Sequence, residues 1–313
     1  MRRPVSYWII LLTLMAMPSA AFAAGGKWIQ VASLPTPRTE VAVAVLDGQI
    51  YVIGGFNETG QAVSTVEVYD PSTDRWSAAP SLPAALHHAG AATIGSDLFV
   101  VGGFKDGWEA VSFVFRYNKA TGAWEKAPSM LTARGALGVI GVEGKLYAMG
   151  GRSNKGDIPA NEVFDPAPGE WEVKKPMPTP RNHLAVAAVG GKIYAVGGRR
   201  GSFLHNLNDT ERYDPNQDTW EVLPPLPTGR SGIAAAVLGS QIFVLGGESA
   251  FGTFSKNEAY DPATNRWQSY APMPTPRHGL GVVAFENRIF AIGGGTQPGG
   301  SVSNIVEVFR PLP

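Results

Sequence analysis

The sequence predicts an all-β fold, a six-bladed β-propeller, and three observations lead to this prediction. An apolar run ends in Gly-Gly six times, and these pairs recur about every 48 residues, a period typical of propeller repeats. A tryptophan recurs with the same period. The 38 glycines and 25 prolines among 313 residues are typical of short strands joined by tight turns. The pairs are Gly54-Gly55, Gly102-Gly103, Gly150-Gly151, Gly197-Gly198, Gly246-Gly247 and Gly293-Gly294, and the tryptophans are Trp28, Trp76, Trp124, Trp171, Trp220 and Trp267.

The first complete repeat divides into four strands, named a to d in chain order. Residues 41–46 and 49–53 are apolar runs separated by Asp47-Gly48, a favoured two-residue hairpin turn, and predict strands a and b. Residues 64–69 predict strand c after a longer loop, and Trp76 marks strand d. Four-stranded sheets repeated in this way pack face to face around an axis, which protects their edges.

The two ends of the chain predict how the ring closes. Trp28 belongs to a strand d that has no strands before it, whereas the last repeat ends after residues 306–309 without a tryptophan. We therefore expect the N-terminal strand to pair with the strand near Glu307 and to complete the sixth blade. Backbone hydrogen bonds, rather than a covalent link, would then join the two ends.

The repeat resembles the kelch family, and the resemblance extends over residues 27–313. Gly-Gly is followed by an aromatic residue and then by the tryptophan in the first five copies. This resemblance implies a propeller that binds other molecules, as eukaryotic kelch adaptors bind acidic peptides with arginines. The aromatic segments are Tyr69-Asp70-Pro71, Tyr117-Asn118, Phe164-Asp165-Pro166, Tyr213-Asp214-Pro215 and Tyr260-Asp261-Pro262.

Residues 1–23 are predicted to be a signal peptide, and residues 24–313 the propeller domain. Arg2 and Arg3 form a basic start, residues 7–17 an apolar run, and Ala21-Phe22-Ala23 a small-residue cleavage pattern. The alternative is an uncleaved membrane anchor, which the short apolar run disfavours. We expect a secreted or periplasmic protein that is monomeric and is not inserted in a membrane after cleavage.

Charge and composition exclude several classes of function. The 26 basic and 26 acidic residues give no net charge, so nucleic acid is not an expected partner. Cysteine is absent, which excludes disulfides, thiolate metal sites, a lipoprotein anchor and a cysteine nucleophile. No glycine-rich phosphate loop or nucleophile elbow is present, and we expect no cofactor.

Arginine and glutamate recur in register with the repeat. Five repeats carry arginine at a fixed distance after the tryptophan and glutamate in strand c, whereas the second repeat has Leu86 and Phe115 at these positions. This joint absence predicts an ion pair within each blade, replaced once by an apolar contact. In the other interpretation, the arginines ring the channel mouth and bind an anion. The expected pairs are Arg38–Glu67, Arg134–Glu162, Arg181–Glu211, Arg230–Glu258 and Arg277–Glu307.

The loops between strands b and c predict the binding face. Only these loops vary in length, and variable loops on a rigid scaffold usually carry function. Strand direction places them on one face with the d–a connections, and Trp108 is an aromatic anchor candidate because it lies outside the repeat register. The candidate binding residues are Phe56, Trp108, Arg152, Arg199, Arg200, His205, Glu248, Phe251 and Phe254.

Histidines are the remaining candidates for chemistry. His88 and His183 occupy matching positions two residues after the arginine position, and His278 follows it by one, so d–a loops could bring imidazoles near the axis. Polar loop histidines are commoner than metal sites, and we expect no metal here.

Two functions of different classes remain open. The first is a binding module that presents the b–c and d–a loops to a protein or carbohydrate. The second is a cofactor-free sugar isomerase, because bacterial periplasmic kelch enzymes that interconvert sialic acid anomers are similar in overall organisation. In such an enzyme Glu248 would act as the base beside a cationic site formed by Arg152, Arg199 or Arg200.

Overall fold

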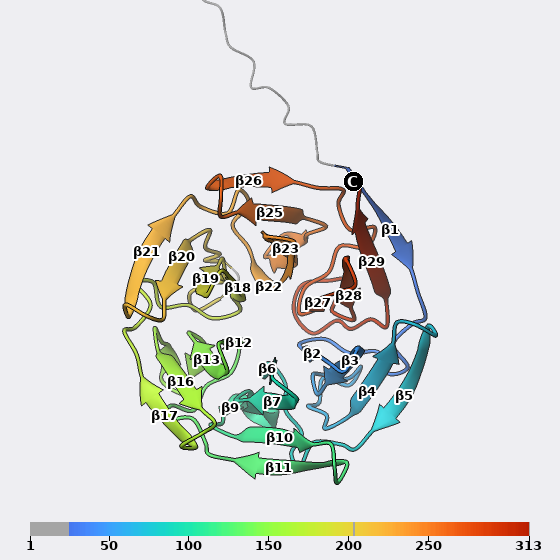
Figure 1. Ribbon diagram of the computed structural model, residues 1–313. Helices are drawn as coiled ribbons and strands as arrows, with labels where there is room; N and C mark the ends of the chain where they lie inside the picture. Colours follow the sequence, from blue (N-terminus) through green and yellow to red (C-terminus); the bar gives the residue numbers. More distant parts are fainter. Residues whose placement is uncertain (1–24, 203, 313) are drawn as a thin grey trace, which may run out of the picture.

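The chain forms a closed ring of six four-stranded blades in the residues described by the structure, 25–202 and 204–312 of a computed structural model (Figure 1). The predicted signal peptide lies outside these residues. The strands of each blade are given from the axis outward. Blade 1 consists of β2 (Ala42–Leu46), β3 (Gln49–Ile53), β4 (Val66–Asp70) and β5 (Arg75–Ala79), and blade 2 of β6 (Gly90–Ile94), β7 (Asp97–Val101), β10 (Val114–Asn118) and β11 (Ala123–Ala127); blade 3 consists of β12 (Gly138–Val142), β13 (Lys145–Met149), β16 (Asn161–Asp165) and β17 (Glu170–Val173), and blade 4 of β18 (Ala185–Val189), β19 (Lys192–Val196), β20 (Thr210–Asp214) and β21 (Thr219–Leu223). Blade 5 consists of β22 (Ser231–Leu238), β23 (Gln241–Ser249), β25 (Asn257–Asp261) and β26 (Arg266–Ser269), and blade 6 of β27 (Gly281–Phe285), β28 (Arg288–Ile292), β29 (Val306–Pro311) and β1 (Gly26–Gln30).

The predicted closure is confirmed. Strand β1 pairs antiparallel with β29, with Trp28 opposite Phe309 and Gln30 opposite Glu307. The Trp28 indole also donates a hydrogen bond to the Ala271 carbonyl of the preceding blade at 2.9 Å. Figure 1 shows the blue N-terminal strand beside the red C-terminal strand. One blade is therefore shared by both ends of the chain.

The predicted all-β character is also confirmed. Helical structure in the described part of the chain is limited to one 3-10 turn, Asp106–Trp108. It lies between the short strands β8 (Phe104–Lys105) and β9 (Glu109–Ala110) in a b–c loop. Within those described residues, no helix is long and apolar enough to cross a membrane.

Small residues in the inner strands let the blades approach each other near the axis. A Cβ atom added to Gly90 would lie 2.2 Å from the Val139 side chain of the next blade. Gly138 faces Val186 in the same way. The inner strands interlock because a valine side chain of one blade packs against a glycine of its neighbour.

The Gly-Gly pairs join successive blades. A Cβ atom on Gly54 would lie 2.5 Å from the Leu86 carbonyl oxygen, while the Gly55 amide donates to that same oxygen at 2.8 Å. Both glycines have positive φ, 61° and 97°, a conformation that glycine adopts without strain. The equivalent amides are Gly103 to Arg134, Gly151 to Arg181, Gly198 to Arg230, Gly247 to Arg277 and Gly294 to Arg38.

The expected arginine–glutamate contacts are present. Arg38 lies fully buried, with Nη2 2.6 Å from Glu67 and Nη1 donating to the Gly54 carbonyl at 2.8 Å. The other distances are 2.6 Å for Arg134–Glu162, 2.5 Å for Arg181–Glu211, 2.5 Å for Arg230–Glu258 and 2.7 Å for Arg277–Glu307. Leu86 and Phe115 lie instead in one buried apolar cluster. These arginines hold their own blades together and do not line an anion site at the axis.

Candidate functional site

The b–c and d–a connections share one face of the disc, here called the loop face. Thr39 of a d–a connection bridges Phe56 of a b–c loop, and His87 bridges Phe104 in the next blade. The same pairing recurs between Asn182 and Arg199. Residues directly after the arginine position therefore lie beside residues directly after Gly-Gly, so loops far apart in sequence meet around the axis.

A closed ring of backbone hydrogen bonds surrounds the axis at this face. It consists of the residues two positions after each arginine position, and each amide donates to the carbonyl of the preceding member. The bonds are His88 to Glu40 at 3.1 Å, Ala136 to His88 at 2.8 Å, His183 to Ala136 at 2.9 Å, Gly232 to His183 at 3.1 Å, Gly279 to Gly232 at 2.9 Å and Glu40 to Gly279 at 2.7 Å. This axial ring ties the blades together at their narrowest point.

Every member of the axial ring has a left-handed backbone. Glycine fits this conformation at Gly232 and Gly279, with φ of 64° and 58°. Glu40, His88 and His183 adopt it with φ of 53°, 54° and 53°, although a side chain makes it unfavourable by about 1 to 2 kcal/mol per residue. Such strain tends to occur where side chains have functional roles. Here it places a carboxylate and two imidazoles together at the axis.

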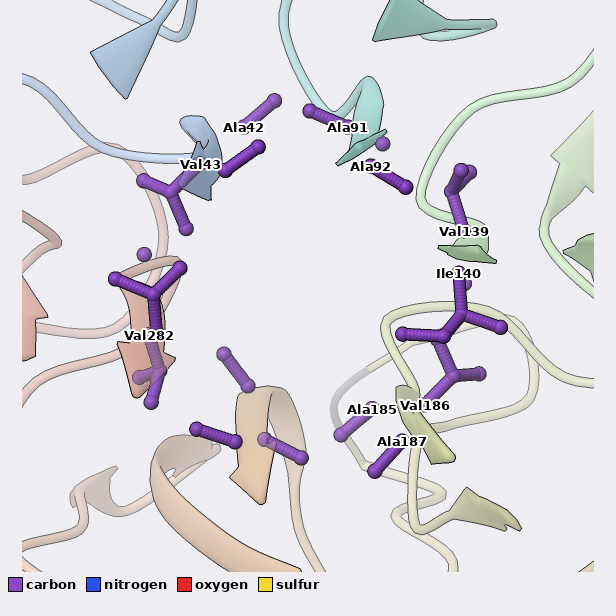
Figure 2. Close-up of a pocket in the computed structure, with 18 of the residues that line it drawn as sticks. Ala42, Val43, Ala91, Ala92, Val139, Ile140, Ala185, Val186, Ala187 and Val282 are labelled. Atoms are coloured by element: carbon purple, nitrogen blue, oxygen red, sulfur yellow. The ribbon is translucent and has the colours of Figure 1, made fainter. Parts of the chain in front are cut away.

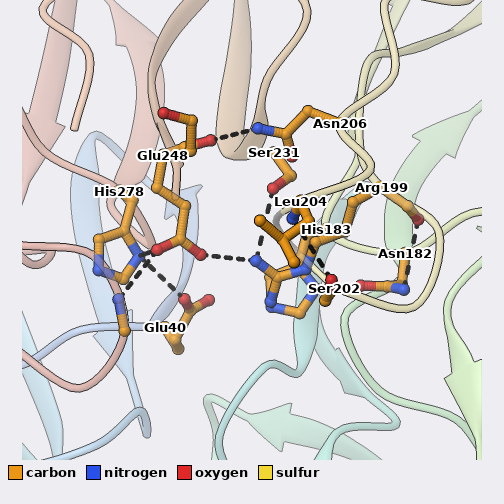
Figure 3. A network of polar contacts seen from close by, with 12 residues as sticks. Glu40, Asn182, His183, Arg199, Ser202, Leu204, Asn206, Ser231, Glu248 and His278 are labelled. Atoms are coloured by element: carbon orange, nitrogen blue, oxygen red, sulfur yellow. Dashed lines mark hydrogen bonds and ion pairs between the residues drawn. The ribbon is translucent and has the colours of Figure 1, made fainter. Parts of the chain in front are cut away.

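A network of charged and polar side chains covers the ring (Figure 3). Glu40 Oε2 lies 3.2 Å from His88 Nε2, and Glu40 Oε1 lies 3.4 Å from His278 Nδ1. His278 Nδ1 is also 3.7 Å from Glu248 Oε2. Arg199 then pairs with Glu248 at 2.6 Å and donates to His183 Nε2 at 2.8 Å. Residues from blades 1, 2, 4, 5 and 6 thus meet at one point.

The network holds its members in different charge states. Burial would raise the pKa of Glu40, but His88, His278 and His183 outweigh it and hold that pKa well below its usual range. Burial, and then the charge of Arg199, holds the pKa of His183 well below its ordinary value. Burial opposes protonation of His278, yet hydrogen bonding and charge from Glu40, with that of Glu248, raise its pKa. A neutral imidazole and a readily protonated one therefore flank the same carboxylate.

A cavity of about 480 Å³ extends along the axis behind the ring. Its wall consists of the inner strands, and Figure 2 shows their alanine and valine side chains, such as Ala42, Val43 and Val186, around the opening. Glu40, His88 and His183 also line it. The axial ring thus separates an apolar channel from the polar network.

An aromatic group lies next to the network. Phe56 stacks on His87 with ring centroids 3.8 Å apart, and Trp108 lies 4.9 Å from His87 and 5.1 Å from His88. Trp108 is 51% exposed and has a positive φ of 63°, which is unusual for so large a side chain. Its indole therefore packs on one side and is open to solvent on the other.

The other predicted binding residues differ in exposure. Phe251 is 98% exposed at the tip of a hairpin between β23 and β24 (Gly252–Thr253), and Arg200 and His205 are exposed as well. Phe254 is half-buried. Arg152, in β14 (Arg152–Ser153), pairs with Asp157 of β15 (Gly156–Asp157) at 3.0 Å.

Two of the predicted binding residues are not available at the surface. Arg199 and Glu248 belong to the loop face but are buried against each other, because the loops fold them inward over the axis. Sequence reasoning missed Glu40, Asn182 and Ser231. The repeat register contains the signal for all three, since Glu40 aligns with His88, and Asn182 and Ser231 align with His278.

Comparison with known proteins identifies the family. A model of the KLHDC2/KLHL20/DRC7 Kelch-repeats domain matches residues 80–247 and 135–294, and the Kelch motif matches residues 37–83. The chain belongs to the kelch-repeat family. This kelch propeller resembles an F-box/kelch-repeat protein of Arabidopsis thaliana (46% identical over 50 residues, 16% of this chain and 13% of that protein). It also resembles Kelch-like protein 35 of Mus musculus (39% over 46 residues, 15% of this chain and 8% of that protein) and Kelch-like protein 33 of Homo sapiens (30% over 90 residues, 23% and 17%). The match spans less than a fifth of the length of each of these relatives.

Proposed function

We propose that this kelch propeller is a secreted or periplasmic binding module whose loop face binds a protein partner. Kelch propellers are typical protein-interaction modules. One observation supports the choice of face. Among the described residues, the exposed large hydrophobic side chains lie on the loop face, on the outer strands or next to the C-terminus, and the a–b and c–d turns have none. The loop-face members are Trp108, Leu131, Leu204 and Phe251.

The exposed aromatic residues support a protein partner. Aromatic and arginine side chains are enriched among the residues that dominate binding energy at protein interfaces. Trp108, Arg200 and Phe251 come from blades 2, 4 and 5, so a partner that contacts all three would cover the polar network between them. A carbohydrate could also stack on the exposed indole of Trp108, and it is the second ligand class to test.

Affinity capture from the native extracytoplasmic fraction tests this proposal. Trp108→Ala and Arg200→Ala are each expected to weaken binding by about 1 to 3 kcal/mol. Lys192→Ala is the matched control, since Lys192 lies on the opposite face and pairs with Asp214 at 2.5 Å. Loss of partner only in the control variant would contradict the assignment of the face.

The proposed location rests on the basic and apolar N-terminal segment. We expect the mature protein to begin at Ala24, since Ala21-Phe22-Ala23 precedes it. N-terminal sequencing of protein recovered from its native host checks this. A chain that retains Met1 would instead support a membrane anchor or retention in the cytoplasm.

A cofactor-free sugar isomerase is the second candidate, and one observation favours it. Glu248 and Arg199 meet at 2.6 Å beside His183 and His278, while Arg152 donates to the Gly201 carbonyl next to Arg200. Carboxylate, imidazole and guanidinium groups thus converge at the axis, as general acid–base chemistry requires. NMR exchange between sialic acid anomers tests it. Faster exchange with the protein, abolished by Glu248→Gln, would replace the binding-module proposal.

A further inference from the structure

We propose that Glu40, His88 and His183 form a binding site for one divalent transition-metal ion of the zinc class. One donor atom from each residue lies within 4.8 Å of the others. Two imidazoles with one carboxylate suit zinc and similar metals. This proposal departs from the expectation of no metal drawn from the sequence, and it does not depend on the partner of the loop face.

Hydrogen bonding around His88 presets it as a ligand. His87 Nε2 faces the Lys105 carbonyl at 3.3 Å, which can only accept, so the N–H of neutral His87 belongs there. His87 Nδ1 then accepts from His88 Nδ1 at 2.6 Å. When His88 is neutral, this hydrogen bond leaves a lone pair on its Nε2, which faces Glu40 Oε2 3.2 Å away. In that state, a cation bound between them would take one ligand atom from each residue.

His183 has the same arrangement. Its Nδ1 faces the Asn182 side-chain oxygen, and its Nε2 is the acceptor for Arg199 at 2.8 Å. A metal-bound histidine typically donates its other ring N–H to an oxygen in this way, which fixes the orientation of the ring. Arg199 also contacts Glu248 at 2.6 Å and Ser231 at 3.4 Å, so metal binding would replace only one of its contacts.

His278 adds a third imidazole beside the cluster. Its side chain is 1% exposed, and Nδ1 lies 3.4 Å from Glu40 Oε1 and 3.7 Å from Glu248 Oε2. Its Nε2 faces the Gln297 carbonyl at 3.0 Å, so Nδ1 is the nitrogen directed toward the cluster.

The backbone supports the same conclusion. Glu40, His88 and His183 all adopt left-handed conformations, while glycine occupies two other positions of the axial ring. The three side chains thus come from blades 1, 2 and 4 at the cost of local strain. Because Glu248 is neutralised by Arg199, Glu40 supplies the negative charge that favours a cation.

Isothermal titration calorimetry of the chelator-treated full protein with Zn²⁺ tests the site. We expect one equivalent to bind, and Co²⁺ to give the visible absorption of a four- or five-coordinate complex. Glu40→Gln and His183→Ala should each weaken binding by at least about 100-fold, because loss of a partner outside the metal's own ligands already costs about 10- to 100-fold. His205→Gln removes an exposed histidine of the same face and should leave binding unchanged.

The contrary outcomes are distinct. Absence of stoichiometric binding to the wild-type protein would overturn the proposal, as would binding that Glu40→Gln leaves intact or that His205→Gln abolishes. A thermal melt of the wild-type protein with and without Zn²⁺ requires no variant. The melting temperature should rise with metal concentration, and a temperature unchanged at saturating Zn²⁺ would count against the site.

Discussion

At the scale of single residues, the pairing of buried arginines with glutamates is the feature that the sequence predicts best. Arg181 is fully buried and meets Glu211, while its other contacts are backbone carbonyls such as that of Ala195. The second blade supports the inference of a pair, because it lacks both charged residues and instead has Leu86 and Phe115 in one apolar cluster. Joint presence and joint absence along one chain were enough to infer the contact.

Removal of one partner tests the cost of an unpaired buried charge. Glu211→Ala should lower the free energy of unfolding by about 3 to 5 kcal/mol, because Arg181 would remain buried without its carboxylate. The double variant Arg181→Leu with Glu211→Phe copies the second blade and should recover most of that loss. Urea denaturation measures both. A double variant no more stable than Glu211→Ala would contradict the account.

The sequence predicts the polar network only in part. His88, His183 and His278 could be placed near the axis by their register, but the inward burial of Arg199 and Glu248 could not. Their positions depend on how the variable loops fold back, and repeat spacing does not encode this. Glu40 aligns with His88 in the repeat register, but its residue type alone does not indicate the left-handed backbone that this position adopts.

At the scale of elements, regular strands were predicted closely and the axial ring was not. The structure has the second strand of the first repeat at Gln49–Ile53, as expected, and the third at Val66–Asp70 rather than residues 64–69. Gly-Gly, turns and tryptophans fix this register. The ring depends on left-handed residues that include Ala136, whose identity does not indicate that conformation.

Two substitutions in the axial ring test its backbone geometry. Gly232→Ala should destabilise the protein by about 1 to 2 kcal/mol, since φ is 64° there and a Cβ atom would lie 3.2 Å from that of His278. Ala136→Gly should have little effect or stabilise slightly, because glycine relieves the strain at φ 52°. Thermal melts of both variants provide the measurement. Equal destabilisation by the two changes would contradict a left-handed ring.

At the scale of the whole molecule, the ends of the chain hold the ring closed. Strand β1 supplies the outer strand of the sixth blade, and Trp28 packs on Phe309 with centroids 5.2 Å apart. This closure was predicted because the first strand has no earlier strands to pair with and the last repeat lacks a strand with a tryptophan. The partner of the loop face could not be predicted, because the variable loops have no repeat pattern to interpret.

Deletion of the N-terminal strand tests the closure. A chain that begins at Ser33 loses Trp28 and the strand partner of β29, which becomes an unpaired edge. We expect a lower melting temperature and a greater tendency to aggregate than in the mature protein. An unchanged melting temperature would show that the sixth blade is stable without this strand.

The central claim, that the loop face is the binding surface, is tested most directly by site-specific photo-crosslinking in the native host. A photoreactive amino acid replaces Phe251, which is 98% exposed, or Lys192 on the opposite face. The account predicts a discrete cross-linked product from position 251 and none from position 192. It also predicts that Trp108→Ala lowers the yield of the product from position 251. A product from position 192 alone, or equal yields from both positions, would contradict the claim.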